Sequence, residues 1–343
     1  MSEEIQLSVI VPTFNRADAL QKTLDYLSKQ RFKKMWEVIV VNNNCTDDTD
    51  EVIRSRQSNF PVPLHLVHEK KPGASAARNA GARTAQGKLL IFVDNDILTE
   101  PDFLERHYKM LQENDNSWVI GQVINMPEQE NSVFGKYRKQ LYPVLSTEET
   151  VRETDIITGQ NVSLPRKHFI LLNGFDENFY VASGEDHEFA MRGRKQLGIK
   201  TLLVPNIVVA HNDWAGWTFQ DFCLRQRMYA RTEFFFWQKY GDEHPRQELV
   251  RENLPINWHN DSVKSKARKV AKQILGTELV QAVLLQSCSV LEKIPSLQPL
   301  LWRIYKLTLA GAINRGFREG RKSALKKQSA DVDSKLAANN PKV

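Results

Sequence analysis

The feature that most constrains this chain is a regular alternation of apolar runs and helix-like segments over its first 110 residues. The runs typical of strands cover residues 6–11, 36–41, 63–68 and 89–93. The segments with helical spacing or composition lie between them, at residues 16–29, 47–56 and 74–85. Strands that alternate with helices of this length form βαβ units around a parallel sheet. We therefore predict an α/β fold with a mostly parallel sheet flanked by helices.

Polar residues follow each of the four predicted strands. They are residues 12–16, 42–44, 70–73 and 94–96. The carboxyl ends of parallel strands meet at one edge of a sheet, and ligands collect at that edge in α/β proteins. These four loops are therefore the first place to look for a binding site.

Two carboxylates one residue apart, Asp94 and Asp96, come directly after an apolar strand. Carboxylate oxygens are the ligands that Mg²⁺ and Mn²⁺ prefer, and such an ion can also bind phosphates. A turn is the competing interpretation, because Asp and Asn commonly initiate turns. The motif is short, and it is compatible with a metal site and with a turn.

Residues 72–81 combine a predicted helix start at Gly73 with a face of small residues, and they contain one long cation, Arg78. A helix N-terminus can face an anion, and small residues let a helix lie close to a sheet. The small residues support close packing and anion binding equally. Arg78 is more informative, because a cation in this setting requires a charged partner.

Three further acids, Glu185, Asp186 and Glu188, begin a predicted helix that Gly198 would end. The helix dipole favours carboxylates in a first turn, which is a purely structural explanation. The same effect keeps a carboxylate ionised and suits it to act as a general base.

His211 follows a predicted strand at residues 201–210. We interpret it as a structural residue unless it reaches a metal held by Asp94 and Asp96.

Composition bounds the remaining possibilities. The three cysteines are far apart, which excludes a disulfide framework and fits a reducing compartment. We see no secretory signal and no apolar run of membrane-spanning length, so we expect a cytoplasmic protein. Residues 262–327 carry 14 Lys and Arg but only 3 Asp and Glu, and the rest of the chain has an acidic excess. A nucleic-acid role is not expected, because this basic stretch has no recognised binding motif.

We expect three regions: a catalytic domain at 1–240, a helical basic region at 241–327 and a disordered tail at 328–343. Two amphipathic helices are predicted at residues 266–292 and 297–318. A basic amphipathic helix that contains Trp can lie in an anionic membrane interface, which would give peripheral association at the inner face of the membrane. Packing of the second helix on the catalytic domain, with a solvated basic face, is the slightly favoured interpretation.

Taken together, six segments resemble the inverting glycosyltransferases of family 2, nucleotide-diphospho-sugar transferases with a GT-A fold. They are SVIVPTFNRADAL (8–20), VVNNNCTDDT (40–49), PGASAARNAG (72–81), FVDND (92–96), TGQNVSLPRKHFILLNGFDENF (158–179) and GEDHEFAMR (184–192). Each is weak alone, but six in the family's order and spacing are specific. The resemblance covers about residues 5–240.

The resemblance implies transfer of a sugar from a UDP- or GDP-sugar to a hydroxyl of a polysaccharide, glycolipid or lipid-linked glycan. It implies a role for each matching residue. The nucleotide-sugar would contact Pro12, Thr13, Asn15, Asn42, Gly73, Arg78, Asp94 and Asn95. A divalent metal, Mn²⁺ or Mg²⁺, would be held by Asp94 and Asp96, with His211 as a third ligand. Asp186 would be the catalytic base with Glu185 beside it, and Gln160 and Asn161 would face the acceptor.

The chain departs from the family at two of these positions. Asn42 stands where the family usually has Asp, although an Asn can still accept a hydrogen bond through its carbonyl oxygen. Gln160 stands where the family has a small residue. A catalytically silent homologue that binds nucleotide-sugar or scaffolds a synthesis complex is therefore the alternative. A sugar-phosphate nucleotidyltransferase would need a Gly-rich basic loop after the first strand, and residues 12–16 are not one.

Overall fold

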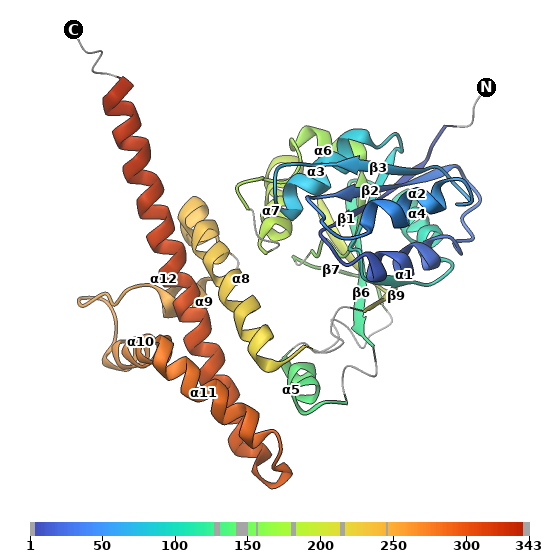
Figure 1. Cartoon of the computed structure of the whole chain (residues 1–343). Coiled ribbons are helices and arrows are strands. Elements are labelled where there is room, and N and C mark those ends of the chain that lie inside the picture. Colours follow the sequence, from blue (N-terminus) through green and yellow to red (C-terminus); the bar gives the residue numbers. More distant parts are fainter. Residues whose placement is uncertain are drawn as a thin grey trace. The chain divides into compact units, whose positions relative to one another are not determined.

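The computed structural model describes residues 4–126, 131–141, 150–155, 157–179, 183–212, 217–244 and 246–338. It contains two compact units, Met1–Gly216 and Trp217–Val343. The first unit holds every strand of the described chain, and the second is helical (Figure 1).

The first unit is built on one mixed sheet with the order β3-β2-β1-β4-β8-β6-β9-β5, and β7 pairs with β9 outside this path. The strands are β1 (Leu7–Thr13), β2 (Trp36–Asn42), β3 (Leu64–His68), β4 (Leu89–Val93), β5 (Ile97–Thr99), β6 (Ser117–Asn125), β7 (Arg152–Glu153), β8 (Asn161–Pro165) and β9 (Lys200–His211). Strands β1 to β4 are mutually parallel, whereas β8 runs antiparallel to both β4 and β6. The predicted α/β fold is confirmed, and each predicted strand is present.

Helices cover both faces of this sheet (Figure 1). One face carries α1 (Ala17–Leu27), α2 (Thr49–Gln57) and α4 (Phe103–Glu113). The other carries α3 (Ala74–Thr84), α6 (Arg166–Leu171) and α7 (Glu185–Leu197). The unit also contains α5 (Val133–Leu141).

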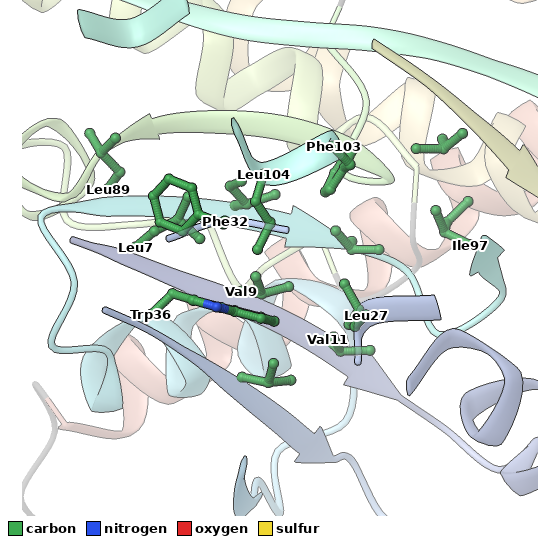
Figure 2. Packing of buried hydrophobic residues seen from close by; sticks show 14 of the residues in the cluster. Leu7, Val9, Val11, Leu27, Phe32, Trp36, Leu89, Ile97, Phe103 and Leu104 are labelled. Atoms are coloured by element: carbon green, nitrogen blue, oxygen red, sulfur yellow. The ribbon is translucent and has the colours of Figure 1, made fainter. Parts of the chain in front are cut away.

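Alternation along the strands sends successive side chains into two separate cores. In β1, Val9 and Val11 belong to one buried cluster and Ile10 belongs to the other. Figure 2 shows part of the first cluster, which also contains Leu27 of α1 and Trp36 of β2. Because both faces are buried, these strands read as continuous apolar runs in the sequence.

Helix α3 lies very close to the sheet, as its small residues predicted. A Cβ atom added to Gly81 would lie 2.5 Å from Cγ2 of Ile10 on β1, so no larger residue fits there. Gly73 precedes the first residue of α3 with φ 124°, a conformation that favours glycine. The predicted helix start at Gly73 is thus confirmed.

The second unit contains α8 (Phe219–Tyr240), α9 (Gln247–Asn253), α10 (Val263–Leu275), α11 (Glu278–Leu291) and α12 (Gln298–Ala338), with short 3₁₀ turns at Gly241–Glu243 and Pro295–Leu297. Helix α12 packs along α8 and against α10 and α11. Its glycines permit this, since a Cβ at Gly316 would lie 2.2 Å from the carbonyl oxygen of Arg227 on α8. The described helices include none that could cross a membrane alone. Only α10 and α11 together reach the length and composition needed, and the chain bends by 77° between them.

Three details of the C-terminal region differ from expectation. Helix α8, which we placed with residues 1–240, packs with the C-terminal helices because it forms the surface that α12 covers. The helix predicted at 266–292 is two helices, separated at Gly276 and Thr277. Helix α12 continues to Ala338, into the region predicted to be disordered, where Ala, Lys and Leu favour helix. Residues 339–343 of that predicted tail lie outside the described residues.

Candidate active site

Arg78 of α3 joins the acids that follow β4 to those that begin α7. Its Nη2 lies 2.9 Å from Oδ1 of Asp94, and its Nη1 lies 2.7 Å from Oε1 of Glu185. The arginine is only 3% exposed. Burial acts to lower the pKa of Arg78, but the carboxylates of Asp94, Glu185 and Asp186 outweigh it and the net pKa is raised. The charged partner that Arg78 requires is therefore a pair of carboxylates.

Gly159 packs directly on the guanidinium group of Arg78. A Cβ atom at this position would lie 2.5 Å from Nη2 and 2.6 Å from Cζ. A side chain at residue 159 would therefore displace the guanidinium group from its present position.

The two acids that begin α7 have different environments. Glu185 is 3% exposed, and its Oε2 is a buried atom with no hydrogen-bond partner among the described residues. Burial and the neighbouring Asp186 raise the pKa of Glu185 to about 7, although the Arg78 ion pair opposes this. The side chain of Asp186 is 17% exposed, and its Oδ1 accepts a hydrogen bond of 2.8 Å from the His187 amide. Asp186 is therefore the more accessible carboxylate, as a base that meets a substrate must be.

Asp96 lies between a cation and an imidazole. Its Oδ2 is 2.9 Å from Nη1 of Arg16, and its Oδ1 is 3.3 Å from Nε2 of His211. Strands β5 and β9 produce this proximity, since Ile97 and His211 are register partners. Nε2 of His211 also lies 3.3 Å from Nε2 of Gln160.

The predicted metal ligands are only partly assembled. Within the described residues, no group of three or more His, Cys, Asp or Glu side chains is arranged to hold a metal ion. Asp96 and His211 are adjacent, but Asp94 is ion-paired with Arg78 instead. An oxygen and an imidazole nitrogen side by side fit a divalent ion that takes its other ligands from a bound diphosphate and water.

The residues predicted to contact a nucleoside form one bonded network at the ends of β1, β2 and β4. Nδ2 of Asn95 donates to Oγ1 of Thr13 at 2.8 Å. Oδ1 of Asn15 accepts from the Thr46 amide at 2.8 Å, and the Asn15 amide donates to Sγ of Cys45 at 3.1 Å. Pro12 is the penultimate residue of β1, so it lies at the same edge.

Both ends of the Asn42 side chain form hydrogen bonds within the protein. Its Oδ1 accepts a hydrogen bond from the Cys45 amide at 2.7 Å, and its Nδ2 donates to Oδ1 of Asp50 at 2.6 Å. The carbonyl oxygen through which Asn42 could accept a hydrogen bond from a ligand is therefore engaged by the protein's own backbone. Gly73 is tied to the same loop, because its amide donates to Oδ1 of Asn43 at 2.8 Å.

The two residues predicted to face the acceptor differ in exposure and in contacts. Gln160 is partly exposed and reaches His211. Asn161 is completely buried, with Oδ1 2.8 Å from Nε2 of His107 and Nδ2 bonded to backbone oxygens of Gln122 and Ile207. Asn161 is thus placed to tie β8 to its neighbours rather than to meet an acceptor.

Sequence reasoning assigned no role to three residues that the structure places at the site. Arg16 adopts a left-handed backbone conformation (φ 68°) and pairs with Asp96. Gly159 packs against the guanidinium group of Arg78, and Phe14 is 63% exposed between Thr13 and Asn15. A signal existed for Arg16 and Phe14, since an exposed aromatic and a cation both occur in the polar loop after β1. Nothing in the sequence connects Gly159 with Arg78.

Known proteins with similar sequences are glycosyltransferases. Residues 8–168 match the model of glycosyl transferase family 2. An uncharacterized glycosyltransferase of Bacillus subtilis, YfnE, is 25% identical over 61% of this chain and 65% of its own length. Glycosyltransferase GlyG of Streptococcus pneumoniae is 32% identical over 39% of this chain and 44% of its own. The chain thus spans less than two thirds of the length of these relatives.

Among solved structures, a mannosyltransferase of Pyrobaculum calidifontis in complex with GDP-Man and Mn²⁺ is similar over 92% of this chain and 88% of its own (TM-score 0.57, 20% identity). At this identity the likeness establishes the fold, which is GT-A. Residues 8–168 thus match glycosyl transferase family 2, and the unit that contains them has the GT-A fold.

Proposed function

We propose that this protein transfers a sugar from a nucleotide-diphospho-sugar to a hydroxyl of a glycan or lipid-linked acceptor, with inversion at the anomeric carbon. The observation that carries the proposal is the chain of contacts Asp94–Arg78–Glu185, which brings the predicted donor end of the site to the start of α7. Asp186 follows Glu185 in the same helical turn. A donor held near Asp94 would therefore lie close to the proposed base.

The reaction would be a single displacement. Asp186 would remove the proton of the acceptor hydroxyl as that oxygen attacks the anomeric carbon from the face opposite the diphosphate. Such a step inverts the configuration and needs no covalent enzyme intermediate. Arg78 keeps Glu185 in place behind Asp186 and thereby fixes the start of α7.

Mn²⁺ or Mg²⁺ is the proposed cofactor, and Asp94, Asp96 and His211 would hold it. Bound there, the ion would offset the charge that builds on the leaving diphosphate. Neighbouring structures support a divalent ion: the mannosyltransferase was solved with Mn²⁺, as was the structure titled GalNAc-T7 with UDP, GalNAc and Mn²⁺ (TM-score 0.55).

Release of nucleoside diphosphate tests the proposal. We would incubate the full chain with UDP- and GDP-sugars in the presence of Mn²⁺ or a chelator. We expect metal-dependent release of UDP or GDP from at least one donor, even with water as acceptor. The absence of release from every common donor would favour the alternative, a silent homologue that binds nucleotide-sugar.

We also propose that the second unit associates with the inner face of an anionic membrane. On α12, Leu301 and Tyr305 are buried within the unit, so these two residues are not part of the binding surface. Exposed apolar residues lie on α11, on the segment between α11 and α12, and on the first part of α12. They are Leu279, Val283, Val290, Ile294, Leu297, Leu300 and Leu307. A hollow of about 450 Å³ opens among them, lined by Val283, Gln286, Ser287, Val290, Leu291 and Ile304.

Charge favours a lipid surface over a second copy of the chain as the occupant. The exposed cations Lys293, Arg303 and Lys306 occur in the same segments, and α11 has no acid between Leu279 and Leu291. Each cation near an anionic surface contributes about 1 kcal/mol, whereas two such faces would repel each other.

Co-sedimentation with vesicles tests this surface. The protein should bind phosphatidylglycerol vesicles and not phosphatidylcholine vesicles, and the double variant Val283→Asp, Val290→Asp should lose binding. Leu224→Asp on α8, where Leu224 is 48% exposed, is the matched control and should still bind. A wild-type protein that ignores anionic vesicles, or that dimerises through this face, would rule the membrane assignment out.

A further inference from the structure

The loop before α10 carries an exposed tryptophan on a hydrogen-bonded turn. Trp258 is 71% exposed. The Asn257 amide donates to Oδ2 of Asp261 at 2.8 Å, and the Asp261 amide donates to the carbonyl oxygen of Asn257 at 2.9 Å. Oδ1 of Asn257 also accepts from the amides of His259 and Asn260. The loop is therefore closed by its own hydrogen bonds, although its largest apolar side chain lies in solvent.

Two lysines of α10 hold this loop on the helix. Nζ of Lys269 lies 2.7 Å from Oδ2 of Asp261 and 3.3 Å from the carbonyl oxygen of Pro255. Nζ of Lys266 donates to the carbonyl oxygen of Trp258 at 2.8 Å and lies 5.9 Å from the centre of its indole ring. These contacts keep Trp258 beside α10 while its ring remains exposed.

Helix α10 has an exposed apolar stripe. Val263, Val270 and Ile274 are all exposed, and their spacing places them on one face of the helix. The buried Lys269 lies on another face. Helix α10 is followed directly by α11 (Figure 1), and Leu279 in the first turn of α11 is exposed as well. The stripe therefore continues into the exposed apolar residues of α11 described above.

The charge of this region fits an anionic surface. Helix α10 contains five Lys and Arg residues and no Asp or Glu. Acids that contact the helix are paired with its cations: Asp261 lies 2.7 Å from Lys269. Glu252 lies 2.7 Å from Lys272. Lys264 in the first turn is exposed, so two copies of this face would repel each other, whereas an anionic bilayer would attract it.

On these observations, and resting on the membrane association proposed above, we propose that α10 and Trp258 form an interfacial anchor. The helix lies in the plane of an anionic bilayer surface, and Val263, Val270 and Ile274 enter the boundary of the acyl chains. The indole ring of Trp258 lies at the level of the headgroups, where aromatic side chains are favoured. Lysine side chains at the edge of the stripe reach the lipid phosphates.

Co-sedimentation of the full chain with phosphatidylglycerol vesicles tests the anchor. The double variant Trp258→Ser, Val263→Ser removes two exposed apolar side chains without changing the charge, so it should bind at least about tenfold more weakly than wild type. Lys264→Gln should bind about fivefold more weakly. Leu224→Ser on α8 is the matched control and should bind as wild type does. The substituted side chains are all exposed, so each variant should match wild type in urea denaturation.

Fluorescence quenching locates the tryptophan directly. Vesicles of phosphatidylglycerol mixed with phosphatidylcholine brominated along its acyl chains should quench part of the tryptophan emission of wild type. Trp258→Phe keeps an aromatic ring at the interface, so it should still bind these vesicles but show a smaller loss of emission. This difference reports the depth of residue 258 and does not depend on affinity.

The possible results separate the anchor from the association that it rests on. If wild type does not bind anionic vesicles, the membrane association fails and the anchor fails with it. If the double variant binds as well as wild type, or if Trp258→Phe is quenched as strongly, only the anchor is overturned. A loss confined to Lys264→Gln would mean that α10 attracts anions without entering the bilayer. A dimer that the double variant abolishes would assign this face to a second copy, and either result overturns the anchor.

Discussion

Nη1 of Arg78 lies 2.7 Å from Oε1 of Glu185, and both residues are only 3% exposed. Removing one member of a buried ion pair leaves the other charge without compensation. Arg78→Met should therefore lower the free energy of unfolding by about 3–5 kcal/mol, measured by urea denaturation. The double variant Arg78→Met, Glu185→Gln should recover part of this loss. Equal stability of wild type and Arg78→Met would show that the pair is not formed in solution.

Glu185 should make stability depend on pH in a defined direction. Its pKa is raised from 4.5 to about 7 in the folded protein. The folded state binds more protons than the unfolded state between these values, so the free energy of unfolding falls as pH rises through this window. The loss is about 3 kcal/mol in total.

Glu185→Gln should lack this dependence, because glutamine stays neutral. Urea denaturation of both proteins from pH 4.5 to 7.5 measures this dependence. The free energy of unfolding of wild type minus that of Glu185→Gln should decrease over that range. Glu51→Gln, at an exposed position, should track wild type throughout. If the difference in the free energy of unfolding between wild type and Glu185→Gln is constant with pH, the raised pKa of Glu185 is contradicted.

Asp186→Asn tests the proposed base. Loss of a general base lowers kcat by about a hundred- to ten-thousandfold. Nucleotide binding should be largely unchanged, because the donor contacts lie on other elements. Both are measured once a donor is known, by turnover and by calorimetry. Near-normal turnover in the variant would remove Asp186 from the mechanism.

Asp96→Ala should abolish activity and metal dependence together. Titration with Mn²⁺ in wild type and variant measures this, and His211→Ala tests the second proposed ligand separately. Full activity in the presence of a chelator would contradict a metal at Asp96. An unaltered Mn²⁺ requirement in His211→Ala would exclude His211 alone from the ligand set.

Gly159→Ala should disturb the site through Arg78. The added Cβ would lie 2.5 Å from Nη2, so the guanidinium must move, and overpacking of this kind costs about 1–3 kcal/mol. The expected result is lower stability together with lower kcat. In an Arg78→Met background the substitution should cost little more, because the atom it strikes is gone. A full additional loss in that background would mean that Gly159 acts elsewhere.

The donor half of this site was predictable because its signals are local. Asp94 follows the end of a strand, and Gly73 precedes the start of a helix. Hydrophobic patterning identifies both elements. The fold then brings them to one sheet edge without further information. Strand β8 was not predicted, since only Val162 and Leu164 of its five residues are large and apolar and it ends at a proline.

The remaining features depend on contacts between distant residues. Arg16 and Asp96 are 80 residues apart in the sequence, and no periodicity links them. The use of the Asn42 oxygen by the Cys45 amide depends on the path of one loop, which composition does not specify. Sequence patterns identify which residue types reach the site, but the pairing among them is set by packing.

The position of β8 has a consequence for how the molecule is made. Although β6 comes earlier in the chain, β8 lies between β4 and β6 in the sheet. The parallel half therefore keeps an open edge at β4 during synthesis until residue 165 has emerged. Closing this edge requires contacts between distant parts of the chain, which form slowly. We expect a nascent chain to contain a folded donor half and an exposed strand edge before any catalytic base is in place, a stage at which chaperones would be most needed.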